Sequence, residues 1–64
     1  MNEEWLYIMD YANSDIYKLN ISNMEYDNVE EVIEPYGLNA DECAYMSTSS
    51  EIDNIKELTE KDKV

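Results

Sequence analysis

The chain has 64 residues, of which sixteen are Asp or Glu and four are Lys, with no Arg or His, so its formal net charge is −12. This balance excludes direct binding to nucleic acid, because Lys and Arg are needed to replace the counterions of phosphates. A chain this short buries only about 60% of the surface that it exposes when unfolded, and its single cysteine forms no disulfide within it. We therefore expect one small domain over residues 1–59, stabilised by a well-packed core or by association with another chain.

Two apolar segments near the start of the chain predict a β-hairpin. The first, Trp5–Met9, is aromatic and β-branched. Both of its faces are apolar, which is typical of a strand that is covered on both sides or buried at an oligomer contact. The second, residues 16–21, alternates apolar and polar side chains as a half-buried strand does. Residues 11–15 between them include Asn, Ser and Asp, which favour a turn.

A short helix is predicted after the hairpin. Apolar residues recur at helical spacing over Val29–Tyr36, and acidic residues fill the other side of the helix. Asp27 stands where an N-cap is favoured, and Glu30 three residues later completes a capping box. Pro35 removes a backbone hydrogen bond, so we expect the helix to end or tighten near Glu34.

The remaining chain predicts a third strand and a C-terminal helix. The strand is Cys43–Met46, which ends at a run of Ser and Thr. Residues 51–59 are predicted as a helix because apolar residues recur three apart, with a short edge strand as the alternative. Residues 60–64 are charged and are expected to form a flexible tail. The predicted fold is thus a small α+β domain ordered β-β-α-β, possessing an antiparallel sheet with one face covered by the first helix.

The sequence offers little for catalysis. It has no His for acid–base chemistry at neutral pH and no Arg to clamp a phosphate. Cys43 has no His to activate it, and a free Cys in a strand is usually a buried core residue. We therefore expect a protein that is not an enzyme and that binds no cofactor or structural metal. Loose binding of a divalent cation by the helix carboxylates is a minor hypothesis.

The N-terminus and the length of the apolar runs predict the cellular compartment and whether the chain spans a membrane. The acidic N-terminus lacks the basic start of a secretory signal. The longest apolar run, Trp5–Met9, is far shorter than the roughly 20 residues of a membrane span. Together with the lone cysteine, which is typical of a reducing compartment, these features predict a cytoplasmic protein that does not bind membranes.

The acids concentrate on the predicted helix and beyond Ser50. Residues three and four apart on a helix bring their Cβ atoms within about 5–6 Å, and a DNA duplex carries one charge per roughly 1.7 Å of axis. The helix acids, joined by Glu25 and the acids of residues 51–57, are expected to approach this density on one side of the domain. Two tyrosines without a predicted place in the core are candidate interface anchors. The candidate partner-binding residues are Tyr11, Tyr26, Asp27, Glu30, Glu31 and Glu34.

These features favour a non-enzymatic, acidic protein-binding module. Its expected partner is a basic protein surface, such as that of a nucleic-acid enzyme, which it would inhibit by mimicking nucleic acid. The alternative is a small homo-oligomeric or accessory protein whose acidity serves solubility only. In size, acidity and scarcity of cysteine the whole chain resembles small acidic proteins carried by phages and mobile elements, some of which block CRISPR or restriction enzymes. This resemblance implies an anti-defence inhibitor and assigns no site residue.

Overall fold

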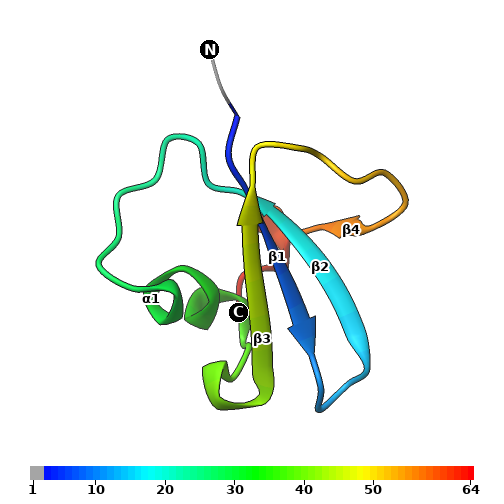
Figure 1. Cartoon of the computed structure of the whole chain (residues 1–64). Coiled ribbons are helices and arrows are strands. Elements are labelled where there is room, and N and C mark those ends of the chain that lie inside the picture. Colours follow the sequence, from blue (N-terminus) through cyan, green and yellow to red (C-terminus); the bar gives the residue numbers. More distant parts are fainter. Residues whose placement is uncertain (1–2) are drawn as a thin grey trace.

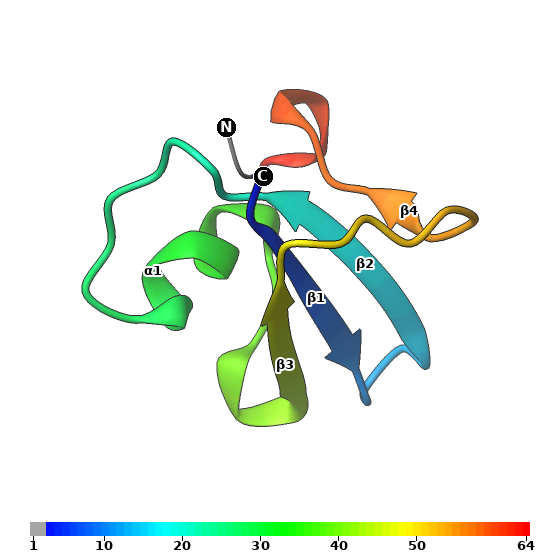
Figure 2. The ribbon, with the colours of Figure 1, turned by 45° about the horizontal axis from the view of Figure 1, so that its top comes forward.

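The chain folds into a four-stranded sheet with one short α-helix packed on it (Figures 1 and 2). The computed structural model describes residues 3–64, so the first two residues of the expected domain lie outside the described range. The strands and the helix are β1 (Trp5–Asp10), β2 (Asp15–Asn20), α1 (Val29–Ile33), β3 (Cys43–Thr48) and β4 (Lys56–Glu57). Three single 3-10 turns complete the regular structure, at Glu34–Tyr36, Ala40–Glu42 and Glu60–Asp62.

The strand order is β3-β1-β2-β4, which places β1 in the interior of the sheet. β1 pairs antiparallel with β2, with Trp5 opposite Asn20, and antiparallel with β3, with Trp5 opposite Thr48. β4 pairs with β2 in parallel. The predicted α+β class and the β-β-α-β order are therefore confirmed, and the sheet is antiparallel except at β4.

The turn between β1 and β2 is held by the side chain of Asp10. Its carboxylate accepts hydrogen bonds from the Ala12 N–H at 3.0 Å and from the Asn13 side-chain amide at 2.9 Å. Asp10 is only 5% exposed, and these two bonds satisfy the buried carboxylate. Ser14 adopts a φ of 56°, a left-handed conformation that occurs in tight turns. The predicted hairpin with a polar turn is thus confirmed.

The helix begins one residue later than the sequence predicts. Asn28 is the N-cap, and its side-chain oxygen accepts a hydrogen bond from the Glu31 N–H at 3.3 Å. The Glu31 carboxylate accepts one from the Asp27 N–H at 2.9 Å. The capping pair is therefore Asn28 and Glu31, and the predicted pair of Asp27 and Glu30 is wrong. Asn and Asp suit an N-cap equally well, so the local backbone decides between two adjacent residues.

Pro35 ends the α-helix as predicted. The helix stops at Ile33 and the chain tightens into the 3-10 turn, where Pro35 stands near the start and its missing N–H is not required. Gly37 closes this turn with a φ of 77°, a left-handed conformation that glycine adopts without strain. The Gly37 N–H donates to the Glu34 carbonyl at 2.9 Å.

The core lies between α1 and one face of the sheet. Its enclosed side chains come from the strands, from α1 and from the segment after β4: Leu6, Ile8, Leu19, Ile21, Val32, Ile33 and Leu58. Each such apolar side chain contributes about 1.5–3 kcal/mol when it is fully buried. Successive side chains of a strand point to opposite faces. Trp5 and Tyr7, which are each 4% exposed, therefore lie on the face away from α1 and need a different cover.

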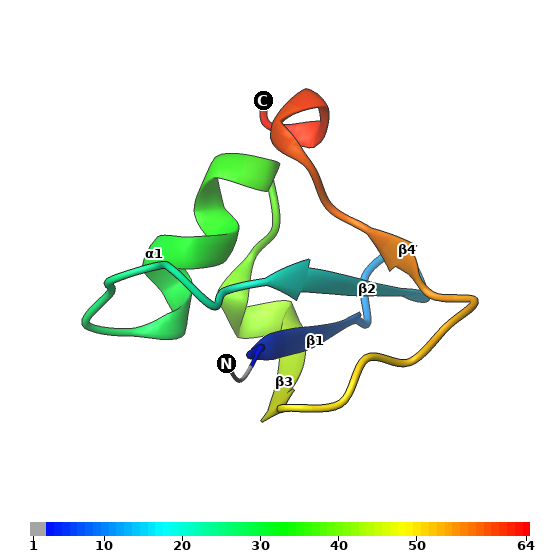
Figure 3. The same cartoon turned by 90° about the horizontal axis from the view of Figure 1, so that it is seen from above.

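Residues 51–59 provide part of that cover and do not form the predicted helix. Figure 3 shows the β3–β4 connection on the side of the sheet opposite α1. The chain then adds β4 beside β2, and the Leu58 N–H donates to the Lys18 carbonyl at 2.8 Å. The apolar residues spaced three apart do not share one face, since Leu58 is 6% exposed in the core and Ile52 is 44% exposed. The alternative, a short edge strand, is correct.

The last residues pack against the end of the helical segment, where the sequence predicts a flexible tail. Thr59 and Asp62 form a capping box that starts the final 3-10 turn, with the Thr59 N–H 2.9 Å from the Asp62 carboxylate. The Val64 N–H donates to the Pro35 carbonyl at 2.8 Å. The bond to Pro35 places the end of the chain beside Gly37, with the Val64 side chain 94% exposed.

The cap assignment predicts unequal effects for two adjacent substitutions. Asn28→Ala removes the side-chain acceptor of the Glu31 N–H and leaves it only the Asn28 carbonyl, 3.2 Å away, so we expect the free energy of unfolding to fall by about 1 kcal/mol. Asp27→Ala is the matched control, because within residues 3–64 the Asp27 carboxylate accepts no hydrogen bond. Urea denaturation of both variants measures the difference. A larger loss for Asp27→Ala than for Asn28→Ala would contradict the assignment.

Candidate protein-binding surfaces

Four of the predicted partner-binding residues lie together at α1, and all four are exposed. We call them the helix acids: Asp27, Glu30, Glu31 and Glu34. Glu30 and Glu31 occupy the first turn of α1, where negative charge is favourable at the positive end of the helix dipole. Within residues 3–64 none of the helix acids forms an ion pair with a lysine. This part of the surface therefore carries uncompensated negative charge.

The two candidate tyrosines lie at different places. Tyr26 is 38% exposed and lines a pocket with Glu31, so it belongs to the same region as the helix acids. Tyr11 is 65% exposed at the hairpin turn and lines another hollow with Met9 and Ile16. The structure thus groups Tyr26 with the helix acids and separates Tyr11 from them.

The acids of residues 51–57 lie on the opposite side of the sheet from α1. They gather around Lys18, whose Nζ is 2.7 Å from Glu51 Oε2. The hydrogen bond to Glu51 raises the pKa of Lys18 against the opposing effect of burial, and the nearby charges of Asp53 and Glu57 raise it further. The expected union of these acids with the helix acids on one side is therefore wrong, because the sheet stands between the two groups.

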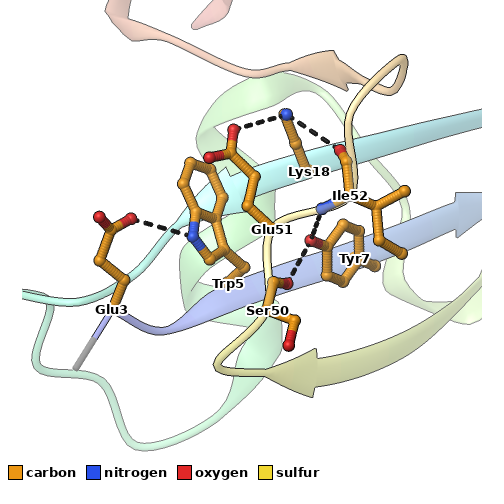
Figure 4. Close-up of polar contacts among 7 residues, drawn as sticks. All are labelled: Glu3, Trp5, Tyr7, Lys18, Ser50, Glu51 and Ile52. Atoms are coloured by element: carbon orange, nitrogen blue, oxygen red, sulfur yellow. Dashed lines mark hydrogen bonds and ion pairs between the residues drawn. The ribbon is translucent and has the colours of Figure 1, made fainter.

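Lys18 and Tyr7 attach the start of the β3–β4 connection to the sheet (Figure 4). The Tyr7 hydroxyl donates to the Ser50 carbonyl and accepts from the Ile52 N–H, both at 2.7 Å. Lys18 is 6% exposed, donates to the Ile52 carbonyl at 3.1 Å and lies 5.4 Å from the centre of the Trp5 ring. Within residues 3–64 no buried side-chain nitrogen or oxygen lacks a partner. This network has a structural role, and it includes Lys18, the most buried lysine of residues 3–64.

Two further lysines also form ion pairs with carboxylates of the same chain. The ion pairs are Lys18–Glu51 at 2.7 Å, Lys56–Asp62 at 3.6 Å and Lys63–Glu60 at 3.1 Å. The same three lysines lie over the rings of Trp5, Tyr17 and Tyr36, respectively. Only Lys61 forms no ion pair within the described part of the chain. Three of sixteen acids therefore have a lysine partner there, and the rest leave the surface strongly negative.

A second exposed surface is apolar. Met9, Ile16 and Met46 are 41%, 51% and 51% exposed, and we call them the open sheet face. Met9 lies opposite Ile16 across β1 and β2, while Met46 lies opposite Tyr7 on the same face of the sheet. Cross-strand neighbours at this spacing contact one another. In the sequence, this surface is indicated by the first strand, whose two faces are both apolar. The pattern does not indicate which end of the second face stays uncovered.

The structure adds little in favour of catalysis or metal binding. Burial raises the pKa of the Cys43 thiol, and the charges of Asp10 and Glu42 raise it further, so the thiol is protonated at neutral pH. In the described range, no group of three or more His, Cys, Asp or Glu is placed to hold a metal ion. No helix formed by residues 3–64 has the length and apolar character needed to cross a membrane.

Comparisons with protein-family models, curated proteins and solved structures gave no match. The helix acids and the open sheet face are therefore the basis for assigning a function.

The Tyr7 network predicts a specific loss of stability. Tyr7→Phe keeps the ring but removes the hydroxyl, which leaves the Ser50 carbonyl and the Ile52 N–H without their partner. We expect the free energy of unfolding to fall by about 1–3 kcal/mol, together with faster amide hydrogen exchange at Ile52. Tyr11→Phe is the matched control, because the exposed Tyr11 hydroxyl makes no hydrogen bond within residues 3–64. Equal stabilities of the two variants would show that the network does not hold the connection.

Proposed function

We propose that the protein is a non-enzymatic binding module whose acidic surface docks on a basic surface of another protein. The observation that carries this proposal is the allocation of charge. Three of the four lysines pair with carboxylates of the same chain, while all four helix acids are exposed and form no ion pair with a lysine within residues 3–64. A net charge of −12 exceeds the magnitude of about 2–8 that keeps a small domain soluble.

The partner that best fits this chemistry is a protein with a basic channel or groove for nucleic acid. Opposite charges speed the encounter and select the partner, and both effects weaken as salt is added. Carboxylates placed in such a groove exclude the phosphates that normally enter it, so the module acts as an inhibitor by mimicry. The proposal agrees with the anti-defence role implied by the resemblance to small acidic proteins of phages and mobile elements.

The helix acids are the proposed contact, with Tyr26 as an aromatic anchor at their side. Tyr26 is exposed and lines the same pocket as Glu31, so an apolar ring and carboxylates face one partner together. Tyrosine is enriched among the residues that contribute most to protein interfaces. The acids around Lys18 are less suited to this role, since Glu51 is already bound to that lysine.

A second candidate function, self-association, is favoured by the open sheet face. Its three apolar side chains are exposed on one face of the sheet, and exposed apolar patches, when large, mark sites of association. The adjacent strand β3 is at the edge of the sheet, pairs only with β1 within residues 3–64, and contains no charged residue or proline to block further pairing. In this alternative the acidity serves solubility.

Matched charge variants test the proposed docking. Glu30→Gln/Glu34→Gln neutralises two helix acids, and Asp53→Asn/Glu57→Gln makes the same change in charge on the opposite side of the sheet. Each full-length chain is immobilised and used to capture proteins from a cell lysate at low salt. We expect the wild type and the second variant to retain a nucleic-acid-binding protein that duplex DNA or about 0.5 M NaCl releases. The helix variant is expected to retain much less of it.

Two results would count against docking by mimicry. Captured proteins that duplex DNA does not displace would exclude a nucleic-acid groove as the target. Equal losses of captured protein for both variants would show that binding depends on net charge and not on the position of the helix acids.

Self-association makes a separate prediction. Screening by salt reduces the repulsion between two acidic chains, so a dimer formed through the open sheet face should strengthen between low salt and about 0.5 M NaCl. Met46→Glu places a charge on that face and is expected to abolish the dimer in sedimentation experiments. Met24→Glu is the control, because Met24 is 42% exposed in the loop before α1. A monomer at every salt concentration rules this alternative out.

A further inference from the structure

A pocket of about 220 Å³ lies beside the helix acids. Its lining residues include Tyr26, Glu31, Pro35 and Tyr36, and we call it the tyrosine pocket. Sites for small molecules usually measure roughly 300–1,000 Å³. The tyrosine pocket is smaller, so its size suits one side chain of another protein better than a separate ligand.

The chain places one of its own lysines at this pocket. Lys63 lines the tyrosine pocket, and its Nζ lies 5.8 Å from the centre of the Tyr36 ring. The bond from the Val64 N–H to the Pro35 carbonyl holds the C-terminal turn in position. Figure 3 shows this turn close to the end of the helical segment. The tail is thus attached at the rim of the pocket and supplies a cation to it.

The lining of the pocket is suited to a cationic side chain. The faces of aromatic rings attract ammonium and guanidinium groups, and Glu25 and Glu31 add negative charge at the same place. Apolar carbon from Val32 and Pro35 can contact the methylene stem of a lysine or arginine. A neutral or acidic side chain would match the apolar part of the lining only.

Lys63 is weakly held at the pocket. Its side chain remains 39% exposed, and its ion pair with Glu60 joins two residues of the same turn, with Glu60 86% exposed. Ion pairs this open to water contribute little stability. Another cation can therefore replace Lys63 without breaking a buried contact.

We infer that the tyrosine pocket receives a Lys or Arg side chain of the partner, and that Lys63, which lines the pocket, competes with this side chain for the ring of Tyr36. This inference rests on the proposed function, since it names the contact by which a basic protein is recognised. The C-terminal turn then acts as an internal substitute for the partner. Its ammonium group opposes the entry of weakly bound cations and moves aside for a side chain that other contacts hold in place.

The test uses n-butylammonium, which reproduces the end of a lysine side chain, and the neutral 1-pentanol, which has a similar size. Each is titrated into the wild type, Lys63→Met and Lys61→Met, while the NMR signals of Tyr26 and Tyr36 are followed. Lys61→Met is the matched control, because it removes the same charge from the same turn and Lys61 does not line the pocket. We expect Lys63→Met to bind n-butylammonium about two- to fivefold more tightly than the wild type and Lys61→Met.

The inference is overturned if 1-pentanol binds Lys63→Met as well as n-butylammonium does, or if the signals of Tyr26 and Tyr36 do not move. Equal affinities of Lys63→Met and Lys61→Met would also overturn it, since net charge alone would then explain the binding. These titrations contain no protein partner. Their failure is therefore distinct from failure of the capture experiment, which tests the proposed function itself.

Discussion

Strand β1 is apolar on both faces, and the chain has to provide a different cover for each one. α1 packs on the face of Leu6 and Ile8, where the contacts are apolar. The β3–β4 connection covers part of the other face, and its attachment depends on the hydroxyl of Tyr7 and the ammonium of Lys18. These two residues stand opposite each other in the hairpin, so the sheet presents both polar groups to the same segment. The positions of β4 and of the C-terminal turn follow from this attachment.

The use of lysine explains how so acidic a chain is arranged. Three lysines each combine an ion pair with a position over an aromatic ring, at Trp5, Tyr17 and Tyr36. All three lysines connect the C-terminal third of the chain to the rest of the fold. The positive charge is therefore used to attach the C-terminal third of the chain. The negative charge at α1 remains available for another molecule.

The two exposed surfaces favour different kinds of contact. The helix acids and Tyr26 combine charge with an aromatic ring, which suits selective and salt-sensitive binding to a basic protein. The open sheet face is apolar and lies beside a free strand edge, which suits pairing with a second chain. They are built on different elements, α1 and the sheet, so a single molecule has room for both contacts. Recognition of a basic partner has the stronger support, because the charge far exceeds what solubility requires.

The local pattern of the sequence determined the hairpin, the third strand, the short helix and its end at Pro35, because each depends on residues that are close in the chain. It also singled out the helix acids. Only the tertiary structure decided the conformation of residues 51–59. Their apolar spacing permits a helix, but Tyr7 and Lys18, more than thirty positions away, bind Ser50, Glu51 and Ile52 in a path that is not helical. The same contacts put Glu51, Asp53 and Glu57 on the far side of the sheet from α1. These long-range bonds decide which carboxylates share a surface, and the local pattern of the sequence does not encode the bonds.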